Sequence, residues 1–405
     1  MHITTLEVFP GLKDLISPER FRRVDGAVQT LFTRTIQKME DGLPFIITGD
    51  IPAMWLRDST WQLKPLLISK NPEVIQLLVD VSRTQVKLFL EDPFANAFNS
   101  SPNGNCWHKD FPDQSPWVFE RKFELDSWAS ILYFARKLYA NHGRSEHLDN
   151  DFRKAINVML SLAKSEQNHD PESYIFHRNN KIPHDSLSHA GRGAPTAFTG
   201  MIFSGFRPSD DACTYGYLIP SNLFFMNELR HLPIRSEFPE VESIAEDISQ
   251  GVARFGVIDG IYAYEVDGMG NALFMDDANV PSLLSLPYLG VTTDNDPIYL
   301  KTRDFVLSEK NPFYFSGSSA SGIGSPHTPD QHVWPIALAI QALTSGNQEI
   351  QLQTLDLLER NDAGTGKMHE SFHVNDDGIF TREWFSWSDM TYVDLVLASV
   401  NYQNS

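Results

Sequence analysis

The 405-residue sequence has few of the features that mark secreted, nucleic-acid-binding or membrane proteins. It contains only two cysteines, Cys106 and Cys213, too few for a disulfide framework. Lys and Arg number 33 against 52 Asp and Glu, and this net charge of −19 leaves no basic footprint for nucleic acid or an anionic membrane. No apolar run approaches the ~18–20 residues that span a bilayer, and no secretory signal is visible. We therefore expect a cytoplasmic protein with no nucleic-acid or membrane partner.

Aromatic residues, by contrast, are abundant. They make up 12% of the chain, with 27 Phe and 8 Trp, in an otherwise ordinary composition of 41% hydrophobic and 21% charged residues. An acidic and aromatic protein suits a neutral ligand such as a sugar. No low-complexity linker or compositional boundary divides the sequence, so we expect one domain spanning residues 1–405.

Apolar residues recur mainly at helical spacing. The pattern predicts amphipathic helices over residues 19–39, 66–90 and 152–165. Alternation typical of strands is limited to two short pieces, residues 260–266 and 369–383, each beside a turn that contains Asp-Gly. The sequence therefore predicts a mostly helical protein with short β-hairpins.

A weak repeat gives this helical pattern an architecture. Six times, an acidic or histidine-bearing cluster is followed by an apolar, aromatic-rich run, and steps of 68, 85, 66, 55 and 57 residues leave room for a returning helix. The clusters centre on Asp58, Asp126, Asp211, Asp277, His332 and Asp389. Six helix pairs predict an all-α toroid, an (α/α)6 barrel with short β-hairpins in its rim loops. The clusters would form one acidic, aromatic pit, although any single Asp could instead cap its helix.

One segment matches a metal-binding motif in its residue types but not in the helical context that the motif requires. Residues 369–373 match the zinc-protease pattern H-E-x-x-H, which needs both histidines on one helical face. Gly364 and Gly366 precede the match and Gly378 follows it, which leaves little room for a helix. In an extended segment, residues four apart stand about 13 Å from each other. We expect no metal, and the lack of a phosphate loop or a dinucleotide fingerprint predicts no cofactor.

Paired carboxylates remain as candidate catalysts. Glycoside hydrolysis with inversion needs a protonated acid at the leaving oxygen and a carboxylate that activates water, roughly 6.5–9.5 Å apart. The adjacent Asp210 and Asp211 offer an acid whose pKa burial and a like-charged neighbour would raise, and only one of them can face the substrate directly. Glu383, among the aromatics of residues 384–387, is the candidate base; the alternative is a loop ion pair with Arg382 or another basic residue.

These candidates lie in segments that resemble a known enzyme family. The run Thr-Gly-Asp-Ile-Pro-Ala-Met-Trp-Leu-Arg-Asp-Ser at residues 48–59 resembles the signature of glycoside hydrolase family 125, the exo-α-1,6-mannosidases. Residues 206–212, 274–281 and 382–387 are similar to the same family, in the expected order across nearly the whole chain. The resemblance implies an (α/α)6 barrel and metal-independent hydrolysis of terminal α-1,6-mannose with inversion.

The resemblance also implies roles for individual residues. It places the general acid at Asp210 and the general base at Glu383. The side chains implied to bind the terminal mannose are Trp55, Arg57, Asp58 and Asn279. The rim pattern itself adds Glu124, Asp126 and His332 as candidate sugar ligands.

The sequence therefore predicts an exo-acting glycosidase that removes α-1,6-linked mannose from mannooligosaccharides or N-glycan fragments. A mannose-containing oligosaccharide would be its partner. Two alternatives stay open at this point. One is another (α/α)6-barrel glycosidase or phosphorylase acting on α-glucosides, and the other is a non-catalytic sugar-binding protein on the same scaffold.

Overall fold

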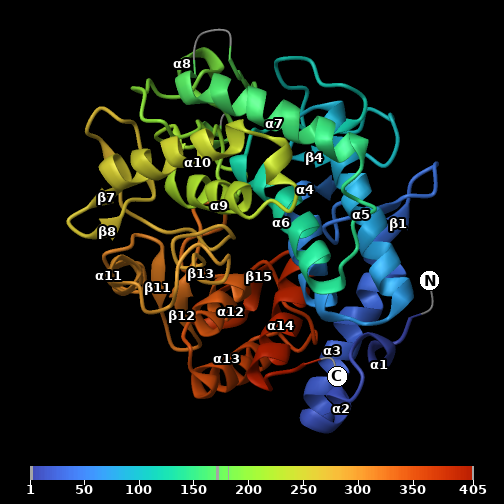
Figure 1. The fold of residues 1–405 in the computed structure, drawn as a ribbon. Coiled ribbons are helices and arrows are strands. Elements are labelled where there is room, and N and C mark those ends of the chain that lie inside the picture. The colour runs from blue at the N-terminus through green and yellow to red at the C-terminus, as the bar shows by residue number, and fades with distance from the viewer. Residues whose placement is uncertain (1–2, 170–172, 181, 404–405) are drawn as a thin grey trace.

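The computed structural model describes residues 3–169, 173–180 and 182–403 and is built mainly of helices (Figure 1). The longer helices are α3 (Pro18–Thr30), α4 (Leu56–Leu63), α5 (Pro72–Glu91), α6 (Leu125–His142), α7 (Asn150–Asn168), α9 (Ile219–Arg230), α10 (Glu240–Gly251), α11 (Pro297–Val306), α12 (Pro335–Leu343), α13 (Gln348–Arg360) and α14 (Ser386–Ser399). Three single-turn helices are α1 (Thr5–Val8), α2 (Leu12–Leu15) and α8 (Ser188–Gly191).

Local sequence signals set the starts of several outer helices. A polar side chain just before the helix accepts backbone N–H bonds of the first turn, which otherwise lack partners. Such caps precede α3, α5, α7, α11 and α13, at Ser17, Asn71, Asp149, Asp296 and Asn347. In α3, α5 and α11 the next residue is a proline, whose fixed φ suits the first helical position.

The helices pack in two layers. Helix α4 contacts α6 and α14, α6 contacts α9, and α14 contacts α12. A second set lies outside these: α5 packs on α6, α10 on α9, α13 on α12 and α14, and α3 on α14. Figure 1 shows α7 and α10 along the outer side of α6 and α9. The inner helices thus follow one another in space in the order α12, α14, α4, α6, α9.

Short antiparallel strands fill the connections. The pairs are β1 (Ile36–Lys38) with β2 (Pro44–Ile46), β7 (Val257–Ile258) with β8 (Ile261–Tyr262), and β11 (Tyr314–Ser316) with β12 (Ser321–Ile323). The three-stranded sheets are β3 (Met54–Trp55), β4 (Ala97–Phe98), β5 (Val118–Glu120); β10 (Ala272–Leu273), β9 (Glu265–Val266), β6 (Tyr217–Leu218); and β13 (His332–Val333), β14 (Ser371–His373), β15 (Asp376–Thr381). Strands β3, β6 and β13 lead almost directly into the inner helices α4, α9 and α12, so they fix where those helices begin.

A mostly helical chain with short hairpins confirms the coarse prediction from sequence, but two predicted helices need correction. In the helix expected over residues 19–39, α3 ends at Thr30 and a π-helical turn continues it to Thr35; only the last residues leave the helix and form β1, where Ile36 lies opposite Ile46. The helix expected over residues 66–90 begins only at Pro72, after the Asn71 cap. In both places the apolar spacing persists while the backbone changes conformation.

The fourth predicted inner helix, after Asp277, is not a helix. Residues 281–290 form bends and turns. Both carboxylate oxygens of Asp276 accept backbone N–H bonds, from Leu283 at 2.8 Å and from Leu284 at 2.9 Å. Side-chain acceptors thus replace the carbonyls that a helix would supply to these N–H groups.

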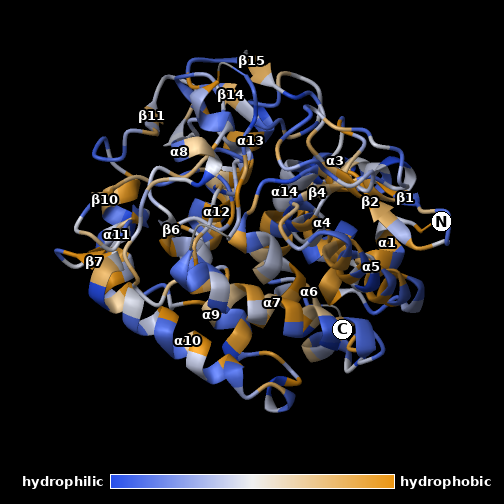
Figure 2. Cartoon of the chain, turned by 90° about the horizontal axis from the view of Figure 1, so that it is seen from above, coloured by the Kyte–Doolittle hydropathy of each residue, from blue (hydrophilic) through white to orange (hydrophobic). Residues whose placement is uncertain are grey.

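One large cluster of buried hydrophobic residues runs through the molecule, from Ile3 to Leu397. Figure 2 shows hydrophobic residues concentrated along α4, α5 and α6, and hydrophilic residues in many of the peripheral loops. Within the described residues, no helix combines the length and the apolar character needed to cross a membrane.

Candidate active site

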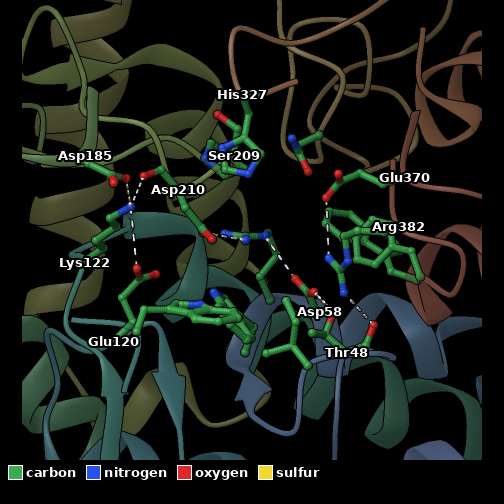
Figure 3. A pocket seen from close by; sticks show the side chains of 18 of the residues that line it. Thr48, Asp58, Glu120, Lys122, Asp185, Ser209, Asp210, His327, Glu370 and Arg382 are labelled. Atoms are coloured by element: carbon green, nitrogen blue, oxygen red, sulfur yellow. Dashed lines mark hydrogen bonds and ion pairs between the residues drawn. The ribbon is translucent and has the colours of Figure 1, made fainter. Parts of the chain in front are cut away.

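A cavity of about 310 Å³ opens among the segments that lead into the inner helices (Figure 3). It contains five of the residues predicted from sequence, namely Trp55, Arg57, Asp58, Asp210 and Asn279. The other lining residues are Thr48, Ile51, Trp107, His108, Glu120, Lys122, Arg178, Asp185, Pro208, Ser209, His327, Trp334, Glu370, Arg382, Phe385 and Trp387. Charged groups of both signs and several indole rings therefore meet in one cavity.

Arg57, in the first turn of α4, is the electrostatic centre of the cavity. Its guanidinium is 3% exposed and forms an ion pair with Glu124, a second with Asp126 at 3.3 Å and a third with Asp210 at 3.2 Å. Burial lowers the pKa of Arg57, but the surrounding carboxylates outweigh burial and raise it well above its usual value. Arg57 thus stays charged and holds side chains from two separate segments, the start of α6 and the loop that carries Asp210, in one arrangement.

Asp210 and Glu124 are the like-charged pair of this site. Burial raises the pKa of Glu124 well above its usual range, against the opposing charge of Arg57. Burial also raises the pKa of Asp210, but the charge of Arg57 and a hydrogen bond from Glu124 outweigh it, so that pKa lies below its ordinary value. Of the two carboxyl groups, Glu124 is therefore the one whose environment favours the protonated form. The sequence-based expectation of a raised pKa on Asp210 is wrong, because Arg57 faces Asp210 directly.

Asp211 occupies a different environment from its neighbour. Its side chain is 1% exposed, does not line the cavity, and accepts a hydrogen bond from His327 at 3.2 Å. The Asp210 side chain is 21% exposed and faces the cavity (Figure 3). Since adjacent residues point in different directions, only Asp210 can approach a bound sugar.

The contact between Asp211 and His327 makes stability depend on pH. Burial lowers the pKa of His327, but the bond to Asp211 raises it to about 9. Stability from this pair is complete below the unfolded-state pKa of about 6.5 and is lost as pH rises through 9. We expect His327→Gln, whose amide still bonds Asp211, to lower Tm by about 1–2 °C at pH 6, because a pair whose histidine is 38% exposed is worth about 1 kcal/mol or less. Thermal melts of both proteins should converge above pH 9; a constant offset would contradict this.

Glu383 does not line the cavity. Its side chain is 72% exposed and lies 3.5 Å from the Lys367 ammonium. The preceding residue, Arg382, has a left-handed backbone (φ 45°) and directs its own guanidinium into the cavity. Glu370 lines the cavity instead, 3.5 Å from Arg382, and Figure 3 shows it across the cavity from Asp210. The Glu383 carboxylate therefore lies in solvent beside Lys367 and not among the aromatic side chains where we expected it.

Three further predicted residues lie outside the cavity lining. Glu124 and Asp126 are buried behind Arg57, which they position. Burial raises the pKa of Asp126 to about 6, against the opposing charge of Arg57. His332 is 4% exposed on β13 and bonds the Ser371 hydroxyl at 3.0 Å, so it supports the hairpin.

Sequence reasoning missed a charged cluster at the opposite end of the cavity from Glu370. Its members are Glu120, Lys122, Arg178 and Asp185. They come from β5, the loop after it and the segment between α7 and α9. None of the four belongs to a recognisable sequence motif. Ion pairs between distant segments leave no periodic signal, so only the fold reveals this cluster.

Aromatic side chains form one wall of the cavity. The Trp55 ring meets Phe119 edge-to-face at 5.8 Å, and Phe119 meets Trp107 in the same way at 5.4 Å. Trp107 is 54% exposed, whereas Trp55 is 4% exposed. Exposed and buried indoles beside carboxylates suit a sugar ring, which has apolar faces and polar edges.

Metal-ligating side chains do not converge in the described part of the chain: no group of three or more His, Cys, Asp or Glu there could hold an ion. Within the H-E-x-x-H match, His369 stacks on Phe380 at 3.8 Å and His373 ends strand β14. The extended conformation predicted for this segment is confirmed, and its histidines serve packing and strand pairing.

Comparisons with known proteins agree with this geometry. Residues 19–397 match the family model described as metal-independent α-mannosidase (GH125). The Meiotically up-regulated gene 157 protein of Schizosaccharomyces pombe is 38% identical over 387 residues, which are 87% of this chain and 76% of that protein.

Solved structures give the same grouping. A metal-independent α-mannosidase of Streptococcus pneumoniae, in a non-productive complex with α-1,6-mannobiose, is 38% identical, with a TM-score of 0.93 over 97% of this chain and 99% of that chain. A bacterial glucoamylase complexed with acarbose has a TM-score of 0.54 at 11% identity, over 87% of this chain and 49% of that one. The second likeness concerns the fold alone.

Proposed function

The chain belongs to the GH125 family of metal-independent α-mannosidases, and from this premise we propose that it removes terminal α-1,6-linked mannose from mannooligosaccharides or N-glycan fragments with inversion. The observation that carries the proposal is Asp210, held by Arg57 at the edge of a sugar-sized cavity. Further support for the linkage comes from the Streptococcus pneumoniae relative and its α-1,6-mannobiose. Family membership favours this function over the α-glucoside and non-catalytic alternatives.

Substrate binding is assigned to the predicted residues that line the cavity. Arg57, Asp58 and Asn279 offer donors and acceptors for the hydroxyls of the terminal mannose. Trp55 offers a flat apolar surface for a ring face. The substrate needs no negative charge to pair with Arg57, because ion pairs with Glu124, Asp126 and Asp210 already neutralise that guanidinium.

We assign the general acid to Asp210. The proton held by Glu124 passes along their hydrogen bond to Asp210, which donates it to the glycosidic oxygen as the bond to C1 breaks. Arg57 contacts both carboxylates and so keeps the donor and the relay aligned. Asp126 stays behind Arg57 and takes no part in the transfer.

We assign the general base to Glu383, as the family resemblance implies. A water molecule on the face of the sugar opposite Asp210 would give its proton to this carboxylate and attack C1. To do so, Glu383 must leave Lys367 and turn into the cavity that its neighbours Arg382 and Phe385 line. Glu370, which already lines the cavity, is the second candidate for this role.

Three further features belong to the proposal. The five inner helices and the turns at residues 281–290 are proposed to close an (α/α)6 barrel, supported by the order of their contacts and by the TM-score to the Streptococcus pneumoniae enzyme. The whole of residues 1–405 is proposed as one catalytic domain, supported by the continuous core. A cytoplasmic location stays a prediction.

The stereochemistry of hydrolysis tests the proposal. We expect proton NMR of the protein with α-1,6-mannobiose to show β-mannose first, followed by mutarotation to the α anomer. First-formed α-mannose would mean retention and would remove the single-step role of Glu383. No turnover of this disaccharide, with turnover of another α-mannoside, would overturn the linkage alone.

A further inference from the structure

Lys122 is a buried cation directly behind Asp210 (Figure 3). Its side chain is 2% exposed, and its ammonium donates to the backbone carbonyl of Asp210 at 2.7 Å. The same ammonium contacts Asp185 at 3.1 Å and Glu120 at 3.6 Å. The lysine thus donates two hydrogen bonds, to the Asp210 carbonyl and to Asp185, and Glu120 adds an ion pair. Burying a charge is costly unless it is paired. The carboxylates around Lys122 offset this cost and leave its ammonium in contact with the Asp210 carbonyl.

The contact is made to a residue with an unusual backbone. Asp210 has φ 67°, in the left-handed region that non-glycine residues seldom occupy. Its N–H donates to the Arg207 carbonyl at 2.9 Å, and its own carbonyl accepts from Lys122. Both sides of the residue are therefore held.

We propose that Lys122 is a positioning residue for the general acid: it fixes the Asp210 carbonyl and so keeps the carboxyl group beside Arg57 and the leaving oxygen. This inference rests on the proposed role of Asp210. It adds a residue from the loop after β5 that makes no hydrogen bond or ion pair to the Asp210 carboxylate. The carboxylates of Glu120 and Asp185, which also pair with Arg178, then serve to hold the lysine.

A loss of acid alignment has a distinctive kinetic signature. Mannose leaving from another sugar needs a proton, whereas 2,4-dinitrophenolate leaves without one. For Lys122→Met we expect kcat on α-1,6-mannobiose to fall about 10–100-fold, because small misplacements of a catalytic group carry losses of that order. KM should change little, and turnover of 2,4-dinitrophenyl α-mannoside should be nearly unchanged. The matched control is Lys164→Met, an exposed lysine on α7, which should behave as wild type on both substrates.

Each outcome decides the inference. Equal losses on both substrates in a folded Lys122→Met protein, or no loss on either, would overturn it, and a raised KM on both would make Lys122 a sugar ligand instead. If Lys122→Met does not fold, Lys122→Arg answers the same question, since it keeps the charge for Glu120 and Asp185 but must fit a planar fork at the Asp210 carbonyl. Asp210→Asn separates this inference from the proposed role of Asp210. If Asp210→Asn loses more turnover on the disaccharide than on the dinitrophenyl substrate and the lysine variants do not, only the inference about Lys122 fails. If Asp210→Asn loses turnover equally on both substrates, the assignment of Asp210 as the general acid fails.

Discussion

Replacing Asp210 with asparagine is expected to lower kcat/KM for α-1,6-mannobiose by about 10²–10⁴-fold, the usual contribution of a general acid. Asparagine preserves the shape of the side chain and can still accept from Arg57, which contacts Asp210 at 3.2 Å. It cannot take the proton from Glu124 and pass it to the glycosidic oxygen. Turnover of 2,4-dinitrophenyl α-mannoside should therefore fall much less. Steady-state kinetics on the two substrates measure this difference.

Asp211→Asn is the matched control for this variant. Asp211 is adjacent in sequence and equally acidic, but it faces His327 and does not line the cavity. We expect it to affect both substrates alike, and weakly. A strong loss on the disaccharide alone in Asp211→Asn, with little effect in Asp210→Asn, would move the acid to Asp211.

The parts of this fold that sequence predicted well depend on local signals. Carboxylates in the first turn followed by apolar residues at helical spacing placed the starts of the inner helices at Asp58, Asp126 and Asp389. The same reasoning failed after Asp277, because apolar spacing cannot show that the Asp276 carboxylate takes the N–H groups that a helix would use. The apolar spacing of residues 281–290 thus predicted correctly that they are mostly buried, but wrongly that they are helical.

The site divides in the same way. Arg57 and Asp210 lie in motifs that sequence shows, and the structure brings both into one cavity. Their protonation could not be predicted, since it depends on Glu124, which is 67 residues from Arg57 along the chain and next to it in space. Lys122 carries no motif at all. The direction of Glu383 depends on the left-handed backbone of Arg382, which side-chain patterns do not report.

The second large effect is expected from Glu383→Gln. Water must be activated whichever group leaves, so this variant should lose about 10²–10⁴-fold in kcat on the disaccharide and on 2,4-dinitrophenyl α-mannoside alike. That loss on both substrates separates a missing base from a missing acid. Azide needs no proton removed before it attacks C1. With the dinitrophenyl substrate, added azide should restore turnover in Glu383→Gln and give β-mannosyl azide, which NMR identifies.

Glu370→Gln is the matched variant, because Glu370 lines the cavity 3.5 Å from Arg382 while Glu383 lies outside it beside Lys367. If Glu383 turns inward to act as the base, Glu370→Gln should mainly raise KM, by removing one polar contact in the cavity, and azide should not increase its rate. The opposite result, with azide rescue in Glu370→Gln and near-normal turnover in Glu383→Gln, would assign the base to Glu370. The exposed carboxylate of Glu383 would then remain the partner of Lys367 throughout the reaction.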